Sequence, residues 1–227
     1  ASFLYGNRNG TTVEYQQITE DSSTDPGVAL FGSPSISGDT LLFNPVSFGI
    51  SAMNGGFDFM DGTFTTTLVS IGNNRIEKIQ FNEYGDWTLL GNGTAGTNAT
   101  VTNTLFVRIT DIDGVSAFTP FTTTASMTFS PSNGSYNLIA NRGQGLVWQG
   151  NVLVDVDAIL AANGYAGRQA RKVNLTFDNA LSAFSEVGTI AYIKKKEIDG
   201  IAITTYVPEP ATFGLLLLGG LVLRRRP

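Results

Sequence analysis

The sequence VTNTLFVRI occupies residues 101–109 and alternates apolar with polar side chains along most of its length. Leu105, Val107 and Ile109 fall on one face of an extended chain, and the residues between them fall on the other. A period of two is typical of a β-strand with one face in a core and the other in solvent. This stretch therefore predicts an antiparallel sheet that buries one of its faces.

The same alternation recurs at Ala125–Phe129 and at Val173–Phe177. Further candidate strands cover residues 12–19, 40–48, 63–71, 75–81, 146–149 and 189–196. Many strands without an alternating strand–helix rhythm favour two packed sheets. We therefore expect a mainly β fold, a two-layer antiparallel β-sandwich of jelly-roll-like form.

Composition supports one such domain over residues 1–206. The 227-residue chain contains 26 glycines, and only 15% of its residues are charged. This length suits a single β domain with a substantial core, and no Pro-rich or Gly/Ser-rich linker divides the body. One short helix is expected over residues 157–163, with Asp157 as its N-cap and Gly164 just past its end.

Turn residues separate the candidate strands. Asn73-Asn74 lies between two of them, and Asp199-Gly200 predicts a hairpin between the strands that contain Ile193 and Ile201. The lysine triplet at residues 194–196 falls inside a predicted strand. Lysines on a strand commonly protect a solvated sheet edge from aggregation, and we expect that role here.

Charge and residue types exclude several functions. The formal net charge is −5, which argues against nucleic acid, because phosphate backbones are bound by dense basic surfaces. The chain contains no His and no Cys, so His-assisted and Cys-based nucleophilic catalysis are both excluded. A carboxylate pair for glycoside hydrolysis remains conceivable, although no pair stands out. We expect a protein that is not an enzyme.

The last 21 residues differ from the body. Pro208, Glu209 and Pro210 precede an uncharged stretch, residues 211–223, and Arg224, Arg225 and Arg226 follow it. The stretch predicts a C-terminal apolar helix of roughly 20 Å, shorter than the roughly 30 Å core of a bilayer. The apolar residues expected on this membrane or assembly helix are Phe213, Leu215, Leu216, Leu217, Leu218, Leu221, Val222 and Leu223. The arginines would stay on the cytoplasmic side.

This arrangement resembles the PEP-CTERM sorting signal, which combines a Pro-Glu-Pro motif, a short apolar helix and a terminal Arg cluster. The resemblance covers residues 207–227 and implies that an exosortase, a membrane transpeptidase, recognises Pro208 to Pro210. It also implies export to the cell surface or extracellular matrix of a Gram-negative bacterium, with the inner membrane as at least a transient anchor. The chain begins with the small residue Ala1, such as cleavage of a secretory signal leaves, although a trimmed chain would begin in the same way.

Two weaker site candidates lie in the body. Asp111 and Asp113 belong to an Asp-x-Asp-Gly segment that could hold calcium, although such segments are more often plain turns. No other cofactor is expected. Trp87 and Trp148 could stack on a sugar, and core packing is the alternative that we favour for both.

The leading hypothesis is a non-catalytic structural protein of the surface or matrix, delivered by the tag. Its partners would be extracellular polysaccharide or like subunits, and its C-terminal helix could drive assembly into filaments. The alternative is a carbohydrate-binding module anchored to the envelope.

Overall fold

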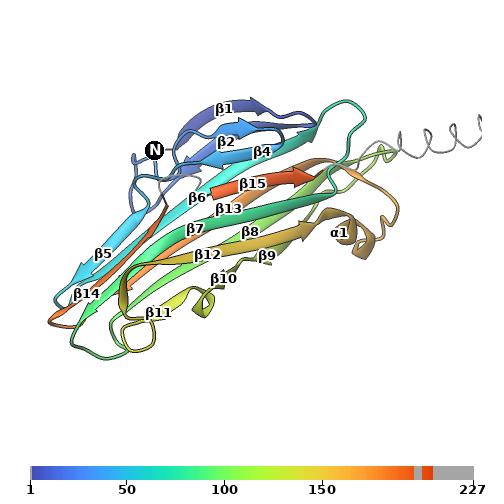
Figure 1. Cartoon of the computed structure of the whole chain (residues 1–227). Coiled ribbons are helices and arrows are strands. Elements are labelled where there is room, and N and C mark those ends of the chain that lie inside the picture. Colours follow the sequence, from blue (N-terminus) through green and yellow to red (C-terminus); the bar gives the residue numbers. More distant parts are fainter. Residues whose placement is uncertain (1, 197–200, 207–227) are drawn as a thin grey trace, which may run out of the picture.

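The computed structural model describes residues 2–196 and 201–206. Within these residues, the strands form two antiparallel sheets that pack face to face, with the long strands along the length of the molecule (Figure 1). We name them the β13 sheet and the β7 sheet after their central strands. The prediction of a mainly β, two-layer antiparallel sandwich is confirmed, whereas jelly-roll-like connectivity stays a prediction. The expected C-terminal apolar helix lies outside the described residues.

The β13 sheet is built around three long strands. Its described strands, in spatial order, are β1 (Phe3–Asn9), β2 (Val13–Asp21), β6 (Phe57–Ser70), β13 (Ala170–Phe184), β8 (Asn98–Ile112) and β11 (Ser135–Asn137), with β9 (Phe121–Ser126) also paired to β8. The register places Asn179 of β13 directly opposite Asn103 of β8. Strands from distant parts of the sequence are therefore neighbours at the centre of this sheet.

The β7 sheet covers the other side of the core. Its described strands, in spatial order, are β10 (Thr128–Ser130), β12 (Gly143–Asp155), β7 (Lys78–Gly91), β15 (Ile201–Tyr206), β4 (Thr40–Phe43) and β3 (Ser35–Ser37), and β14 (Thr189–Lys195) joins β7 to β5 (Gly49–Met53). Both β14 and β15 pair antiparallel with β7, one after the other. They therefore run in the same direction and cannot form the predicted hairpin with each other. The Asp199-Gly200 turn itself lies outside the described residues.

The predicted alternation is confirmed in the core. Leu105, Val107 and Ile109 are fully buried, while Phe106 between them remains 36% exposed. The centre of the sandwich is a cluster of interlocking phenylalanines, namely Phe31, Phe43, Phe48, Phe64, Phe81 and Phe177. Each buried aromatic side chain contributes about 1.5–3 kcal/mol of hydrophobic stabilisation, so this cluster is a principal source of cohesion between the sheets.

Some predicted boundaries were wrong. The strand expected over 40–48 ends at Phe43, and Pro45 beyond it cannot donate to a sheet ladder. The strand expected over 75–81 begins at Lys78 and continues to Gly91. Sequence patterning stopped short because polar and glycine residues interrupt the apolar alternation after residue 81.

The short helix is present, but its cap was assigned incorrectly. Helix α1 (Val156–Ala162) is preceded by Asp155, whose Oδ1 accepts a hydrogen bond from the Ala158 N–H at 2.8 Å. Asp155 keeps an extended backbone at the end of β12, so the helix begins one residue earlier than predicted. Gly164 follows the helix end with a φ of +85°, as the sequence indicated.

The lysine triplet does not form a solvated edge. β14 lies between β5 and β7, and Lys195 points into the core with a side-chain exposure of 0%. Because side chains alternate along a strand, three consecutive lysines cannot all face solvent. Lys195 lies on the same inward face as Ala191 and Ile193. The prediction that the middle lysine of the triplet is solvated was therefore wrong.

Gly85 on β7 leaves room for β14 and for the Trp148 ring, which lies near Lys195. A Cβ atom at residue 85 would lie 2.1 Å from the Lys194 carbonyl oxygen and 2.2 Å from the Trp148 ring. Gly85→Ala should therefore lower the unfolding free energy by about 1–3 kcal/mol through overpacking. Urea denaturation monitored by tryptophan fluorescence measures this change.

The control for this substitution is Asn82→Ala, at a half-buried position on the opposite face of the same strand. It should change stability by no more than about 0.5 kcal/mol. Equal effects of the two substitutions would contradict the packing argument.

Candidate functional site

The outer face of the β13 sheet carries a shallow depression of about 340 Å³ across its three long strands. Its lining residues are Asp61, Gly62, Thr63, Thr102, Thr104, Phe106, Asp178, Asn179 and Ala180. Strands β6, β13 and β8 position these groups, because every second residue of each strand points away from the core. Gly62 and Asn179 also border the depression, but both are buried and belong to the inward phase of their strands. The depression combines carboxylates and hydroxyls with one aromatic ring.

The polar groups are held in place by the sheet. Thr63 Oγ1 donates to Asp178 Oδ1 at 2.8 Å across the β6–β13 pair. Asp178 Oδ2 has no hydrogen-bond partner among the described residues and can accept from a ligand. Phe106 stands on the adjacent strand with 36% of its surface exposed, so its ring can pack against an apolar ligand face.

A second depression of about 230 Å³ extends the first across the sheet. Both are lined by Thr102 and Thr104, and the second reaches Ser126 and Asn133 on the far side of β8. The two depressions adjoin at these threonines, and we refer to them together as the groove. Neighbouring strands lie about 4.8 Å apart, so a groove over β6, β13, β8 and β9 spans roughly 14 Å and suits an extended ligand.

Asp61 anchors one end of this groove. Its carboxylate accepts hydrogen bonds from the backbone N–H and the hydroxyl of both Ser23 and Thr24, at distances of 2.7–3.0 Å. Partial burial favours the neutral acid, but these donors outweigh it and lower the pKa of Asp61 to about 2. Asp61 therefore stays ionised and ties the loop after β2 to β6.

The two tryptophans are buried, and neither lies in the groove. Trp87 is 3% exposed, stacks on Tyr136 with ring centroids 4.0 Å apart, and donates from Nε1 to the Asn141 carbonyl oxygen at 2.9 Å. Trp148 is fully buried and packs edge-on against Phe129. Their prediction as sugar-stacking residues was wrong, and the favoured alternative of core packing is confirmed.

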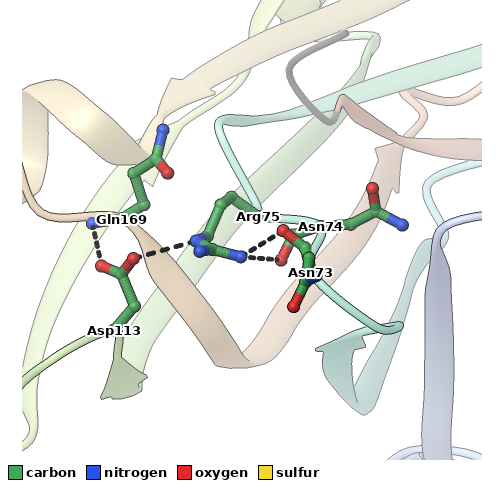
Figure 2. A network of polar contacts seen from close by, with 5 residues as sticks. All are labelled: Asn73, Asn74, Arg75, Asp113 and Gln169. Atoms are coloured by element: carbon green, nitrogen blue, oxygen red, sulfur yellow. Dashed lines mark hydrogen bonds and ion pairs between the residues drawn. The ribbon is translucent and has the colours of Figure 1, made fainter. Parts of the chain in front are cut away.

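The two predicted calcium ligands, Asp111 and Asp113, have different surroundings, and only the Asp113 side chain belongs to a hydrogen-bond network within the part of the chain that the structure describes. Asp113 accepts from the Gln169 N–H at 3.1 Å and from Arg75 Nε at 3.0 Å, and Arg75 also donates to the carbonyl oxygens of Asn73 and Asn74 (Figure 2). Partial burial opposes ionisation, but these two donors lower the pKa of Asp113. Asp111 lies at the exposed end of β8. Among the described residues, no group of three or more acidic residues is placed to hold a metal ion.

The residues of the sorting motif and of the expected apolar helix, 207–227, lie outside the described residues. No helix within residues 2–196 and 201–206 is both long and apolar enough to cross a membrane.

Sequence reasoning missed Thr63, Phe106 and Asp178 as site residues. Alternation already indicated that Phe106 and Asp178 face outward, but it could not indicate that their strands are neighbours.

No protein-family model and no curated protein sequence matches the chain. Among solved structures, the chain is similar to TmCBM61 in complex with β-1,4-galactotriose (8% identity, 86% of this chain, 87% of that chain, TM-score 0.24). It is also similar to the family 11 xylanase from Neocallimastix patriciarum (12% identity, 91% of this chain, 100% of that chain, TM-score 0.25). These TM-scores are too low to assign a fold family or a function.

A third solved structure is the enzymatically active domain of the bacteriophage CBA120 tailspike protein 4. The similarity has 14% identity and a TM-score of 0.23, and it covers 90% of this chain. It covers 19% of the length of that protein. No activity is inferred from it.

Asp61→Asn tests the loop anchor. The folded-state pKa of Asp61 lies below its ordinary value of 3.8, so ionised Asp61 stabilises the fold above that value, and this stabilisation disappears as pH falls through about 2. At neutral pH the substitution should lower the unfolding free energy by about 1 kcal/mol, a figure reduced by solvent screening. The difference from the parent protein should shrink below pH 4, as measured by urea denaturation across pH.

Asp58→Asn is the control for this substitution, because Asp58 lies three residues earlier on the same strand and accepts from the Ser51 N–H rather than from this loop. The contacts between Asp61 and the loop stay intact in this variant, so it should retain the loss of stability at low pH that Asp61→Asn removes. A pH-independent effect of Asp61→Asn would contradict the anchoring role.

Proposed function

We propose that the chain is a non-catalytic, exported surface or matrix protein that binds an extracellular polysaccharide in the groove of the β13 sheet. The observation that carries this proposal is the grouping of the exposed Phe106 ring, the Asp178 carboxylate and threonine hydroxyls on one rigid sheet face. A sugar presents both hydroxyls and an apolar ring face. The groove offers a partner to each of them.

Charge and polarity favour a sugar over other ligands. The groove is shallow and open, and two of its lining side chains, Asp61 and Asp178, are acidic. Carboxylates accept hydrogen bonds from sugar hydroxyls, whereas they repel phosphate groups. The exposed lining of threonines and carboxylates is also too polar for a purely apolar ligand.

The same groups do not suit glycoside hydrolysis. That reaction needs a carboxylic acid with a raised pKa beside a second carboxylate. Asp61 is one of the two acids in the groove, but its pKa is lowered to about 2 and five donors of Ser22, Ser23 and Thr24 hold it. Binding without cleavage is therefore the function that these residues support best.

The route to the cell surface is proposed from the sequence alone. The Pro-Glu-Pro motif at residues 208–210, the apolar stretch and the terminal arginines would be read by an exosortase at the inner membrane. The protein would then reach the surface or matrix of a Gram-negative bacterium. Assembly into filaments through residues 211–223 stays a prediction for a chain that keeps its tail.

Phe106→Ala should weaken polysaccharide binding about tenfold, because an aromatic contact contributes about 1–1.5 kcal/mol. Asp178→Ala should weaken it further by removing an acceptor. Affinity electrophoresis against a panel of neutral and acidic bacterial polysaccharides provides the measurement. The matched control is Tyr84→Ala, which removes an aromatic side chain with a similar exposure of 37% from the opposite sheet. Equal losses from Phe106→Ala and Tyr84→Ala would refute the assignment of the groove.

The C-terminal peptide of the protein in native extracellular material tests the sorting proposal. A chain that ends near residues 208–210 is expected, because the sorting enzyme would remove the tag. Mass spectrometry of the intact chain and of its last peptide makes the measurement. A chain that keeps residue 227 would contradict removal of the tag and favour anchoring or filament assembly.

A further inference from the structure

Four polar side chains meet in the described part of the core, between the two sheets. Glu83 on β7 and Lys195 on β14 come from one sheet, and Asn103 on β8 and Asn179 on β13 come from the other. None of the four is more than 4% exposed. Buried charges are costly unless they are paired, so this cluster requires a specific explanation.

The distances form a closed network. Lys195 Nζ donates to Glu83 Oε2 at 2.6 Å and to Asn179 Oδ1 at 2.9 Å. Asn103 Nδ2 donates to Glu83 Oε1 at 2.9 Å and to the same Asn179 Oδ1 at 3.2 Å. The carbonyl oxygen of Asn179 therefore accepts from two donors, which polarise its carbonyl group.

Two buried polar atoms of the cluster, Asn103 Oδ1 and Asn179 Nδ2, have no hydrogen-bond partner among the described residues. An unsatisfied buried donor such as Asn179 Nδ2 costs about 1–3 kcal/mol. Asn179 Nδ2 is also the atom that would leave as ammonia if a nucleophile attacked Asn179 Cγ.

The surroundings of Lys195 exclude water and make its ammonium group easier to deprotonate. Its Nζ lies 5.2 Å from the centroids of both the Phe48 and the Trp148 rings. Burial lowers the pKa of the Lys195 ammonium, although the Glu83 carboxylate opposes this shift. A desolvated lysine beside a proton acceptor is an activated nucleophile.

We propose that Lys195 and Asn179 form an intramolecular isopeptide bond that joins the two sheets. Nζ already contacts the oxygen of the Asn179 carboxamide, and Cγ is bonded directly to that oxygen. Attack requires Nζ, which lies 2.9 Å from Oδ1, to move from that oxygen to the face of the carboxamide at Cγ. Holding both groups in a dry core replaces a bimolecular encounter with an intramolecular reaction, which is strongly favoured.

The chemical step is balanced without an external reagent. Lys195 passes one proton to Glu83, and the neutral Nζ attacks Asn179 Cγ to form a C–N bond. Nζ then gives up a further proton, Nδ2 gains one, and the Cγ–Nδ2 bond breaks to release ammonia. The new amide keeps one hydrogen, ammonia carries three, and the remaining proton stays on Glu83. No oxidant or reductant is required.

Glu83 and Asn103 act at different points of this step. Glu83 accepts the proton from the lysine and returns one to the departing nitrogen, which is general acid–base catalysis. Asn103 Nδ2 donates to the oxygen that becomes negatively charged in the tetrahedral intermediate. The bond would covalently join the sheets in a chain that has no cysteine, independently of polysaccharide binding.

Mass spectrometry of the purified full chain tests the bond directly. The intact mass should be lower than the sequence mass by one molecule of ammonia. Cleavage after glutamate separates residue 179 from residue 195, because Glu186 lies between them. A single species that contains both peptides, with tandem fragments that locate the bond at Asn179 and Lys195, is expected. An unmodified intact mass would overturn the proposal, as would loss of ammonia with separable peptides, which indicates a succinimide instead.

Variants assign the roles. Lys195→Met and Glu83→Gln should keep their full masses, whereas Lys196→Arg, the matched control, should still lose ammonia. Asn179→Asp should lose water instead, giving a cross-linked product with the same mass as the parent product. Circular dichroism establishes which variants fold, and the intact mass of the parent chain decides the proposal even if Glu83→Gln does not fold. A complete cross-link in folded Glu83→Gln would overturn the role of Glu83.

Discussion

The sandwich depends on burying one charged pair between its sheets. Lys195 and Glu83 meet at 2.6 Å in a region from which water is excluded, and two asparagines of the opposite sheet complete their hydrogen bonds. Removing one partner of a buried ion pair typically costs about 3–5 kcal/mol. A shifted register in either sheet would leave at least one of these groups unpaired. The cluster therefore selects one alignment of the two sheets, which hydrophobic packing alone specifies less sharply.

The groups around this pair make its burial feasible. Gly85 has no side chain to occupy the space that the Trp148 ring fills, and the Trp148 and Phe48 rings lie near the ammonium group. Attraction between a cation and aromatic rings offsets part of the lost hydration. Trp148 therefore stabilises the buried Lys195 in the core, and the binding surface is formed by other residues.

The two faces of the β13 sheet thus have separate roles. Inward side chains of β8 and β13 belong to the core and the buried cluster, and outward side chains of the same strands line the groove. Successive residues on one strand alternate between these environments, as Asn179 and Asp178 do. The loop held by Asp61 joins one end of the groove to the fold, so loop stability and groove shape are connected through a single carboxylate.

The sequence by itself determined the fold class, the strands with strict alternation and the face on which each side chain of those strands lies. Extended along each strand, the same alternation puts Asn103 on the face of Leu105 and Asn179 on the face of Phe177, although neither asparagine stood out from the sequence. Only the tertiary structure decided that these residues meet Glu83 and Lys195, and that Phe106 and Asp178 share a groove. The reason is physical: alternation follows from the local geometry of an extended backbone, whereas the choice of neighbouring strands depends on contacts between distant segments. Lys195 illustrates the difference, since composition suggested a solvated edge and the position of β14 between β5 and β7 placed it in the core.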